Sequence, residues 1–572
     1  MPQDAFTLKY LCADLSQLLS GGKINRIVQT NENEIVFTIY TGKKTEKLII
    51  NVNPSNARIG IVDVEDSQEL AITPNFCVSL RKHLLSATLD SISLVGFDRI
   101  IKIDFTVTQE FSSPTKKSLY VELMGRYSNL FLTQDGKLLA GNRGVNVAGD
   151  FLRPLFVGKP YIFPPTQDKF EPSDNGLIQK LMEYSENDGA FYEFLCANVQ
   201  GISQDTAKEV VYLFTKKEKE FLLNPQKHAQ EFFKFFNDFL FEQTPNPCLL
   251  KVDSGVKDFF LFPYESKSGE YIFCEKLYLA EKTYFQNKTK QNKYKTLFER
   301  LNSCINNAYK KANKKLQAIC SREKDAQSLL ENQLFGELIT ANIYKIKKGD
   351  KKVVLNNYYT GEDVEILLDE NLSPSQNANL YYKRYNKQKR ALVSLQPQKE
   401  LIKSEADYLS SLKEQLSLCE TIDDLELLEE EVLDYGLIKR AHQVKKKTVK
   451  NPFRIYEYNG AEIRVGRNNF ENELLLDQSD KQFVWLHAKD YHSAHVIIRQ
   501  KAEQVSEETI KVSAEICAYY SAGREGGKCE IAYTKRAHVK KPKKSKPGFV
   551  HYTDYKSVTV VANKHAELLK SD

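Results

Sequence analysis

Apolar residues recur at helical spacing along two long stretches of the chain, residues 294–334 and 381–435. In both stretches the apolar positions lie three, four or seven residues apart, and Lys, Glu, Gln, Ser and Asp fill most positions between them. This pattern predicts two long helices that pair along one apolar stripe and expose their flanks to water. The stripe consists of Leu297, Leu301, Ile305, Ala308, Ala312, Leu316, Ile319, Ala326 and Leu330 in the first stretch, and of Leu395, Ile402, Leu409, Leu412 and Leu416 in the second.

The segment between these stretches, residues 335–380, changes to the pattern of strands. Short apolar runs at 341–346, 353–355 and 364–368, joined by Gly-containing turns, predict a small sheet. We therefore expect a helical hairpin with this small domain at its far end, each arm of about 40–50 residues being roughly 60–75 Å long. A dimerisation coiled coil is the alternative. Both arms lie in one chain, which favours self-pairing and a lever that reaches a distant surface.

The first 170 residues predict one helix followed by many short strands. Apolar residues at helical spacing cover residues 4–19, and Gly21-Gly22 ends that helix. Segments rich in Ile, Val, Phe and Tyr follow, separated by Asn, Gly, Ser and Pro, which is the rhythm of a β-sandwich or barrel. The predicted strands are Lys23–Gln29, Glu34–Tyr40, Lys47–Val52, Ser91–Leu94, Arg99–Phe105, Lys117–Leu123 and Asn129–Thr133.

Helices and strands alternate in the rest of the chain. Residues 175–240 read as helices, and Gly201-Ile-Ser203 at their centre looks like the turn of a helix-hairpin-helix, whose amides face a phosphate without sequence preference. Residues 245–278 return to strands. After a Lys-rich polar linker at 445–447, further strands are expected at 454–458, 462–465 and 482–485.

Composition adds few constraints. The chain has 572 residues, 41% of them apolar, enough for several domains with real cores. The net charge of +6 does not by itself indicate a nucleic-acid binder. Ten cysteines without a CxxC pair favour reduced thiols over disulfides or zinc. No run approaches the ~20 apolar residues of a membrane span, and the first residues lack a signal-peptide pattern, so we expect a cytoplasmic protein without membrane contact.

Two polar turns interrupt the N-terminal strands. The turn Gly96–Arg99 places two adjacent opposite charges at the start of an apolar strand. A solvated turn with a weak surface ion pair is the simplest interpretation. Residues 124–130 form a Gly-hinged turn between two strands. That turn offers Arg126, Ser128 and Asn129, which suits an anion or the edge of a sugar. The alternative is a hairpin turn whose Asn and Ser cap backbone groups.

Positive charge gathers in two places. Residues 381–390 interleave Tyr with Lys and Arg, including Lys383 and Arg384, at the base of the tip domain. Between Lys535 and Pro547, seven of thirteen residues are Lys or Arg, broken by prolines, so this segment is expected to stay extended and follow phosphates, with binding that weakens as salt rises. A solvated tail explains the composition equally well.

Two further segments near the C-terminus are rich in polar groups. Residues 466–469 predict a turn that presents Arg467 and amides. Residues 485–499 contain His487, His492 and His495, but their spacing matches none of the usual zinc frames. We therefore favour a polar strand-turn-strand over a metal site and expect no cofactor.

The order of these motifs resembles that of the NFACT family, and the resemblance covers essentially the whole chain. In the family an Asp-Gly pair usually stands near the start, where this chain has Asp4-Ala5, and a Pro-Gly precedes the Ser-His of the histidine loop, where this chain has His492-Ser493. The matching motifs are Asp4, Gly96-Phe-Asp-Arg99, Met124-Gly-Arg-Tyr-Ser-Asn-Leu130, Arg153 with Tyr161, Pro164-Pro165, Gly201-Ile-Ser203, Leu372-Ser-Pro374, Asn377-Ala378, Tyr382-Lys383, Tyr385, Val465-Gly-Arg-Asn-Asn469, Trp485, His487, Lys489-Asp490, His495-Val-Ile-Ile-Arg499, Lys541-Pro542 and Lys546-Pro-Gly548.

The resemblance implies a multi-domain α+β chain. It would begin with a glycosylase-like β-sandwich domain at residues 1–170, followed by a helix-hairpin-helix domain at 171–285. A long antiparallel coiled-coil hairpin at 286–440 would carry a small α/β tip at 335–380. An α/β RNA-binding domain would occupy residues 441–572.

The resemblance also implies a ribosome quality-control factor rather than an enzyme. Such a factor binds the large (50S) ribosomal subunit that still carries peptidyl-tRNA, and recruits alanyl-tRNA for addition of C-terminal alanine without mRNA. Peptidyl transfer belongs to the ribosome, so no catalytic residue is expected. The implied partners are the 50S subunit, tRNA with tRNA-Ala first, and the small S4-domain ribosome-binding protein RqcP.

The family's Asp-Arg pair, which engages tRNA, falls on Asp98 and Arg99. Arg can clamp a phosphate or stack on an unpaired base, and Asp can accept from a base edge, which suits single-stranded tRNA loops. The expected tRNA-binding residues are Asp4, Asp98, Arg99, Arg126 and Asn129, and the expected RNA-binding residues elsewhere are Lys383, Arg384, Arg467, Lys489, Lys540, Lys541, Lys543, Lys544 and Lys546.

Two other function classes compete with this interpretation. In a DNA glycosylase, removal of Met1 would expose Pro2, whose amine could attack an abasic sugar. Those enzymes follow the proline with an acidic residue, where this chain has Gln3, and they carry a zinc-finger cysteine frame that is missing here. The second class is a surface adhesin that binds fibronectin, which no signal peptide, anchor motif or repeat supports.

Overall fold

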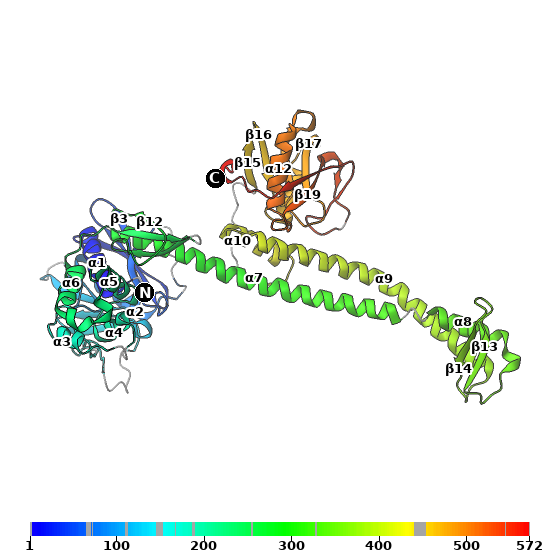
Figure 1. The fold of residues 1–572 in the computed structure, drawn as a ribbon, viewed down its shortest axis with the longest axis horizontal. Coiled ribbons are helices and arrows are strands. Elements are labelled where there is room, and N and C mark those ends of the chain that lie inside the picture. Colours follow the sequence, from blue (N-terminus) through cyan, green and yellow to red (C-terminus); the bar gives the residue numbers. More distant parts are fainter. Residues whose placement is uncertain are drawn as a thin grey trace. The chain divides into compact units, whose positions relative to one another are not determined.

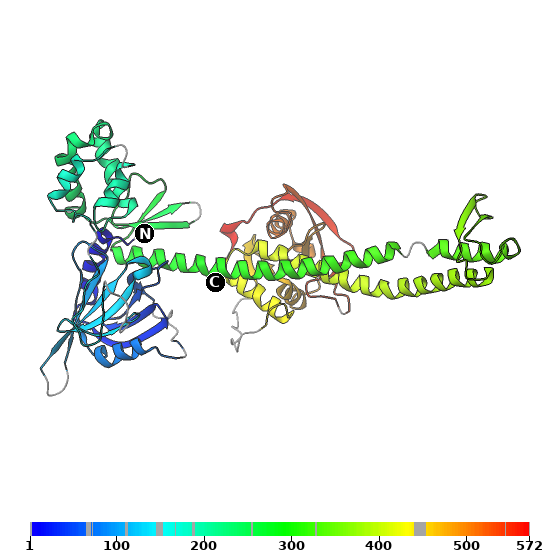
Figure 2. The same cartoon turned by 90° about the horizontal axis from the view of Figure 1, so that it is seen from below.

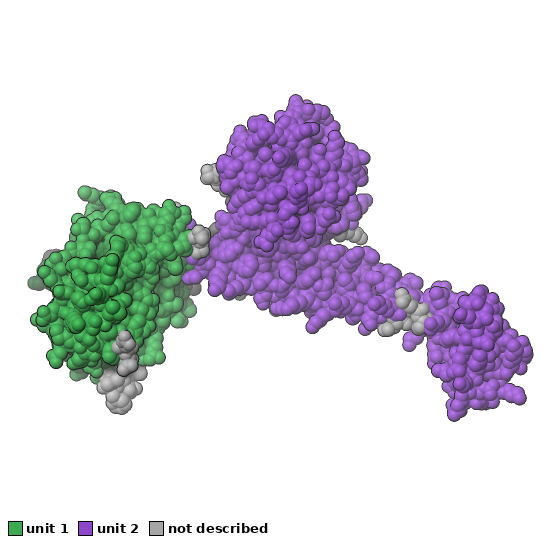
Figure 3. All heavy atoms as spheres, viewed as in Figure 1, with its two compact units in different colours: residues 1–289 green, residues 290–572 purple. Residues whose placement is uncertain are grey.

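The computed structural model describes residues 3–63, 70, 72–108, 113–144, 153–165, 168–185, 189–252, 255–325, 329–439, 453–543 and 545–570. Pro2, Lys544 and the Lys-rich linker at 445–447 lie outside these residues. The chain divides into two compact units, residues 1–289 and 290–572 (Figure 3). Helices and strands occur in both units, so the predicted multi-domain α+β class is confirmed.

The first unit begins with helix α1 (Ala5–Leu19), which packs on a nine-stranded antiparallel sheet. All seven predicted strands are present, most of them with ends that differ from the prediction by a few residues. Strands β4 and β9 were not predicted. The order of the strands in the sheet is β4-β3-β2-β1-β5-β6-β7-β8-β9. Their bounds are β1 Lys23–Asn31, β2 Glu34–Tyr40, β3 Thr45–Asn51, β4 Arg58–Val62, β5 Thr88–Leu94, β6 Ile100–Val107, β7 Thr115–Glu122, β8 Asn129–Gln134 and β9 Lys137–Gly141.

This sheet folds on itself around the core of the unit. The two halves join where β1 pairs with β5 at a single position, Lys23 with Thr88. Phe37 on β2 and Phe105 on β6 stack with ring centroids 6.5 Å apart, although β1 and β5 lie between them. A flat sheet would hold strands three positions apart at a distance of about 14 Å. The curvature explains why the sequence has the rhythm of a sandwich although the hydrogen bonds form one sheet.

Helix α1 also packs against the helices that follow the sheet. The rings of Phe6 on α1 and Phe239 have centroids 5.5 Å apart, and the Tyr10 hydroxyl donates to the carbonyl of Leu240. Figure 2 shows these helices, in cyan to green, on the other side of α1 from the blue strands. The remaining elements are α2 Asn75–Leu84, α3 Gly176–Met182, α4 Phe191–Asn198, α5 Gln204–Lys217, α6 Ala229–Phe241, β10 Cys248–Val252, β11 Gly255–Phe260 and β12 Glu270–Phe273.

Long helices dominate the start of the second unit. Helix α7 (Leu277–Asp325) begins in the first unit, earlier than the predicted residue 294, and lies beside α9 (Pro374–Leu418) in Figures 1 and 2. The predicted stripe is confirmed where Leu301 and Ile305 are buried against Leu412. It was wrong at Leu330, which is 72% exposed. Helix α10 (Ile422–Asp434) completes this core.

The small tip domain contains α8 (Leu329–Ala341) and the hairpin β13 (Lys352–Asn356) and β14 (Asp363–Leu367). Both hairpin strands were predicted. The predicted strand at 341–346 was wrong, because Ile343–Lys345 form a single 3-10 turn after α8. Tyr381 at the start of α9 packs into the small core and donates to the carbonyl of Leu367.

The C-terminal part forms a six-stranded sheet of order β15-β16-β18-β17-β19-β22. Trp485, the single tryptophan of the chain, is fully buried in it. The predicted strand at 454–458 has the same bounds in the structure. The elements are β15 Arg454–Tyr458, β16 Ala461–Val465, α11 Asn469–Asp477, β17 Phe483–Ala488, β18 Val496–Lys501, α12 Glu507–Tyr519, β19 Lys528–Lys535, β20 Val539–Lys540, β21 His551–Tyr552 and β22 Lys556–Val561.

Candidate nucleic-acid interface

Two of the polar turns singled out in the sequence meet at one end of the nine-stranded sheet. Strands β6 and β7 are antiparallel, with Ile100 opposite Glu122, so the start of β6 lies beside the end of β7. The amide of Leu123 donates to the carbonyl of Arg99 at 2.9 Å. The turn at residues 96–99 and the turn at residues 123–128 therefore form one polar edge of the sheet.

The turn at 96–99 is held by its own residues. Gly96 adopts a φ of +61°, which favours glycine, and Phe97 is buried against Phe241 with ring centroids 5.6 Å apart. Oδ1 of Asp98 accepts the amide of Arg99 at 2.7 Å, and both side chains are half-buried. One carboxylate oxygen thus fixes the turn that carries the neighbouring guanidinium.

The turn at 123–128 presents an arginine on an aromatic ring. Arg126 is exposed, and its guanidinium lies 4.7 Å from the ring centroid of Tyr127, which is 67% exposed. Asn129 is half-buried and forms hydrogen bonds with backbone groups of the chain. Its Nδ2 donates to the carbonyl of Arg143, and its Oδ1 accepts the amides of Leu130 and Arg143. Asn129 therefore shapes the turn, as the capping alternative in the sequence suggested.

A buried ion pair between Glu122 and Arg153 lies at the end of β7, next to this edge. Glu122, the last residue of β7, is 1% exposed and accepts from both terminal nitrogens of Arg153, at 2.5 and 2.9 Å. The Tyr161 hydroxyl donates to Glu122 at 2.5 Å, and burial raises the pKa of Tyr161. Sequence reasoning did not single out Glu122; the signal was an acidic residue that closes an apolar strand.

Asp4 is buried and joins three segments rather than facing solvent. It is 4% exposed, caps α1 by accepting the amide of Thr7, and accepts from the amide of Ser203 at 3.0 Å and the hydroxyl of Thr206 at 2.6 Å. The amide of Ser203, predicted to face a phosphate, is thus taken by Asp4. Asp4 acts on the polar edge only through the packing of these segments.

The glycine of the same turn touches the 96–99 turn. A Cβ on Gly201 would lie 2.2 Å from the carbonyl oxygen of Phe97, and its φ is +78°. The carbonyl of Gly201 accepts the amide of Ala5 at 2.8 Å. The segment 201–203 therefore positions the 96–99 turn, since any side chain at Gly201 would push the turn away.

The basic residues of the C-terminal segment fall into two groups. Lys540 and Lys543 are exposed. Lys541 forms an ion pair with Glu473, and the Lys546 ammonium lies 4.5 Å from the ring centroid of Tyr435. Lys544 lies outside the described residues. Among the described lysines of this segment, the side chains of Lys541 and Lys546 thus have partners within the protein, whereas those of Lys540 and Lys543 have none.

Three other predicted RNA-binding residues are exposed. Lys383 and Arg384 lie on α9, and the Arg384 guanidinium is 5.3 Å from the ring centroid of Tyr381. Lys489 pairs with Glu530 at 3.2 Å on the surface, a contact worth little in water. All three side chains are thus accessible to solvent.

Arg467 is not presented as the sequence predicted. Its guanidinium binds the carboxylate of Glu471, and the two side chains are 12% and 7% exposed. Asn468 caps α11 by accepting the amide of Glu471. The segment 466–469 is a helix start rather than an exposed turn, so Arg467 stabilises the domain.

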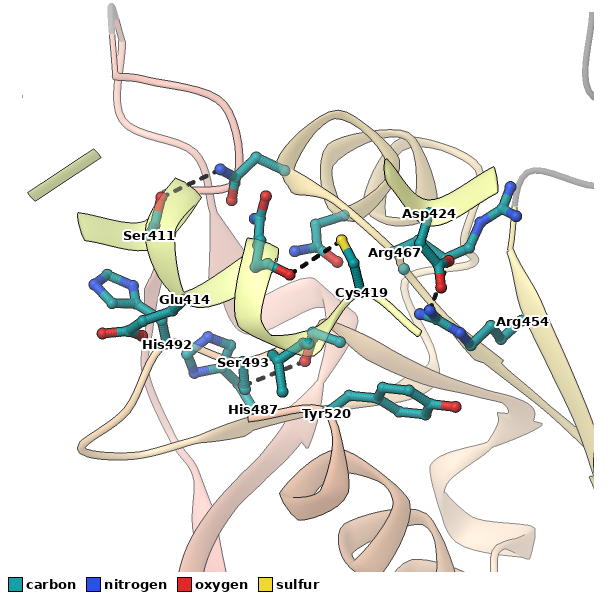
Figure 4. A pocket seen from close by; sticks show the side chains of 17 residues that line it. Ser411, Glu414, Cys419, Asp424, Arg454, Arg467, His487, His492, Ser493 and Tyr520 are labelled. Carbon is teal, nitrogen blue, oxygen red and sulfur yellow. Dashed lines mark hydrogen bonds and ion pairs between the residues drawn. The ribbon is translucent and has the colours of Figure 1, made fainter. Parts of the chain in front are cut away.

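A small polar pocket lies in the second unit, where the C-terminal sheet meets α9 and α10 (Figure 4). Arg454 on β15 binds Asp424 on α10 at 2.7 Å, and Asn469 donates to Ser411 on α9 at 3.2 Å. His487 lines the pocket, and burial lowers its pKa to about 4. Across the described residues, no three His, Cys, Asp or Glu side chains converge as a metal site would require. The Arg454–Asp424 and Asn469–Ser411 contacts join the C-terminal domain to α10 and α9.

Two family models match the chain. One, described as NFACT N-terminal and middle domains, matches residues 4–451, and the other, described as NFACT protein RNA binding domain, matches residues 452–554. The chain belongs to the NFACT family. Among the described helices of this NFACT protein, none combines the length and the apolar character that a bilayer crossing requires.

Curated relatives of this NFACT protein match it from end to end. The Rqc2 homolog RqcH of Bacillus subtilis is 32% identical over 556 residues, which are 96% of this chain and 95% of that protein. The Rqc2 homolog RqcH of Streptococcus pneumoniae is 30% identical over 580 residues, covering 100% of both chains.

Two solved structures are also similar to parts of the chain. The N-terminal part of the fibronectin/fibrinogen-binding protein from Streptococcus suis covers 50% of this chain and 99% of that structure, with 24% identity and a TM-score of 0.41. The C-terminal part of the same protein covers 48% of this chain, with 26% identity and a TM-score of 0.39.

Proposed function

We propose that this NFACT protein is a ribosome quality-control factor. It binds an obstructed 50S subunit that carries peptidyl-tRNA and recruits tRNA, with tRNA-Ala as the first candidate, for alanine tailing that marks the stalled chain for degradation. The observation that carries the proposal is the polar edge of the nine-stranded sheet, called from here on the tRNA edge, where the Asp98-Arg99 turn lies beside the exposed pair Arg126 and Tyr127. The full-length likeness to proteins named RqcH supports it.

The chemistry of the tRNA edge suits an RNA loop. A guanidinium on an aromatic ring offers a flat, charged platform for an unstacked base or a phosphate, and a carboxylate beside it can accept from a base edge. Peptidyl transfer is carried out by the ribosome, so the protein supplies binding and placement. RqcP would be a further partner on the same subunit.

Ribosomal RNA contacts would come from other surfaces. Lys383 and Arg384 on α9, and Lys540 with Lys543 in the C-terminal segment, are exposed cations that can follow phosphates without reading sequence. Loss of the tRNA edge should therefore leave binding to the 50S subunit largely intact.

The first test is to recover the protein from its own cells at mild salt and sequence the bound RNA. Two conservative variants are used. Asp98→Asn keeps an oxygen that can accept from the Arg99 amide, and Arg99→Lys keeps the positive charge but loses the paired N–H donors of the guanidinium. We expect both to lose the dominant tRNA and to retain 50S RNA. Lys116→Gln is the matched control, because Lys116 is exposed at the opposite end of β7.

The outcomes separate the alternatives. Loss of tRNA and 50S RNA together, with a lower melting temperature, would mean that the pair is structural. Retention of tRNA by both variants would remove the tRNA edge as the binding site. If wild-type protein enriches neither RNA, the proposed function is wrong and the adhesin alternative returns.

A further inference from the structure

A groove opens directly beside the tRNA edge in the first unit. It has a volume of about 450 Å³ and lies between α1, β5, the 96–99 turn and the residues that precede α3. Its lining includes Lys9, Leu94, Gly96, Phe97, Glu171 and Phe241. This volume is within the range of roughly 300–1,000 Å³ found for small-molecule sites.

Lys9 brings an uncompensated positive charge to the groove. Among the described residues Lys9 has no ion pair with a carboxylate, and its ammonium lies 4.3 Å from the ring centroid of Phe241 and 5.4 Å from that of Tyr10. Partial burial lowers its pKa. A half-buried cation without a carboxylate favours an anionic group nearby.

Aromatic surface and a polar rim complete the groove. Phe241, the last residue of α6, is 37% exposed and is supported edge-on by Phe97. Glu171 is exposed at the rim, with one carboxylate oxygen 3.7 Å from the position of a Cβ on Gly96. These three groups suit one nucleotide. The aromatic ring can stack on the face of the base, the cation can bind the phosphate, and the carboxylate can accept from the amino edge of the base.

We propose that this groove receives one unstacked nucleobase of the tRNA that the Asp98-Arg99 turn engages; the inference rests on the proposed function. The base stacks on Phe241, the ammonium of Lys9 moves to the adjacent phosphate, and Glu171 accepts from the edge of the base. Since the 96–99 turn forms one wall, the base lies next to the nucleotides held by Asp98 and Arg99. The groove thus adds a specificity element to the tRNA edge.

The test is binding of tRNA-Ala in which each unpaired loop nucleotide is replaced in turn by an abasic one. With wild-type protein we expect one abasic position to weaken binding by about 5- to 100-fold, as the loss of one base–aromatic stack does. With Phe241→Leu, which keeps an apolar contact for Phe97, we expect intact tRNA to bind more weakly and that abasic position to cost nothing further. Lys9→Gln should weaken binding of the intact tRNA and of every abasic tRNA by the same factor.

Phe273→Ala is the matched control, because Phe273 on β12 is 57% exposed away from the groove residues and should leave binding unchanged. Thermal unfolding of Phe241→Leu checks that the fold is kept. If Phe241→Leu and wild type respond equally to every abasic position, the groove inference is overturned while tRNA binding stands. If wild-type protein does not bind tRNA-Ala at all, the proposed function and the groove inference fail together.

Discussion

Glu281 is a buried carboxylate at the start of α7, and its environment sets a pH dependence. It is fully buried, and its Oε1 accepts from Arg58 at 3.1 Å and from Gln3 at 3.2 Å. Burial raises the pKa of Glu281 to about 7, although Arg58 and Gln3 act against the rise. A carboxyl whose pKa is raised on folding stabilises the fold fully below its ordinary pKa of 4.5, and this contribution is lost as pH rises through about 7.

Glu281→Gln removes this titration, so we expect the variant to gain stability relative to wild type as pH rises from 5 to 8. The relative gain over this range should be about 2.5 kcal/mol, since one pKa unit is worth about 1.4 kcal/mol and the carboxyl of the unfolded chain is already largely ionised at pH 5. Calorimetric unfolding of the full chain at several pH values measures it. Glu275→Gln, at an exposed glutamate just before α7, is the control. Parallel pH profiles of wild type and Glu281→Gln would contradict the assignment.

Single residues show what the sequence could and could not reveal. Asp4 was read correctly as the start of a helix, because an acidic residue before an apolar helical pattern is a local signal. Its bonds to Ser203 and Thr206 join residues about two hundred positions apart, and no local pattern encodes them. Arg467 and Glu471 stand four residues apart, which would have predicted their ion pair if the helix start at Asn468 had been recognised.

Among the elements, the strongly periodic ones were predictable and the short ones were not. The apolar stripe identified the pairing of α7 with α9, because burial repeats every three to four residues there. Strands β4 and β9 have five residues each, too few for a clear pattern. The apolar run at 341–346 was assigned to a strand because periodicity cannot separate a short strand from the end of a helix.

The joint between α10 and the C-terminal sheet gives a prediction at this scale. Glu431 on α10 is fully buried and accepts from the Tyr408 hydroxyl at 2.8 Å and from Nδ2 of Asn469 at 2.9 Å. Asn469→Ala removes a hydrogen bond to a buried carboxylate, whose pKa burial already raises. We expect the free energy of unfolding to fall by about 1.5–3 kcal/mol.

Emission of Trp485, the single tryptophan, follows this transition during urea unfolding because the ring is fully buried in the C-terminal sheet. Gln478→Ala, which removes an exposed amide just after α11, is the control and should leave the midpoint unchanged. An Asn469→Ala midpoint equal to that of the control would mean that the joint adds no stability.

Across the whole molecule, function depends on segments that lie far apart in the chain. The 96–99 turn is packed by Gly201 and Phe241 and borders the 123–128 turn. The family resemblance pointed to Asp98 and Arg99, but neither the groove beside them nor Lys9 was visible in the sequence, because a groove is made by tertiary packing. Charge patterning located the basic segment, yet the structure was needed to separate its paired lysines from its exposed ones.

That separation predicts which lysines carry the salt dependence of 50S binding. Lys540 and Lys543 are exposed and have no ion pair among the described residues, whereas Lys541 is paired with Glu473. Each phosphate contact contributes about one unit to the slope of log affinity against log salt, so Lys540→Gln with Lys543→Gln should lower the slope by about two. Co-sedimentation with 50S subunits over a salt series measures it. Lys501→Gln with Lys511→Gln removes equal charge from exposed positions of the same sheet domain and should keep the slope; equal slopes for both double variants would place the RNA contacts elsewhere.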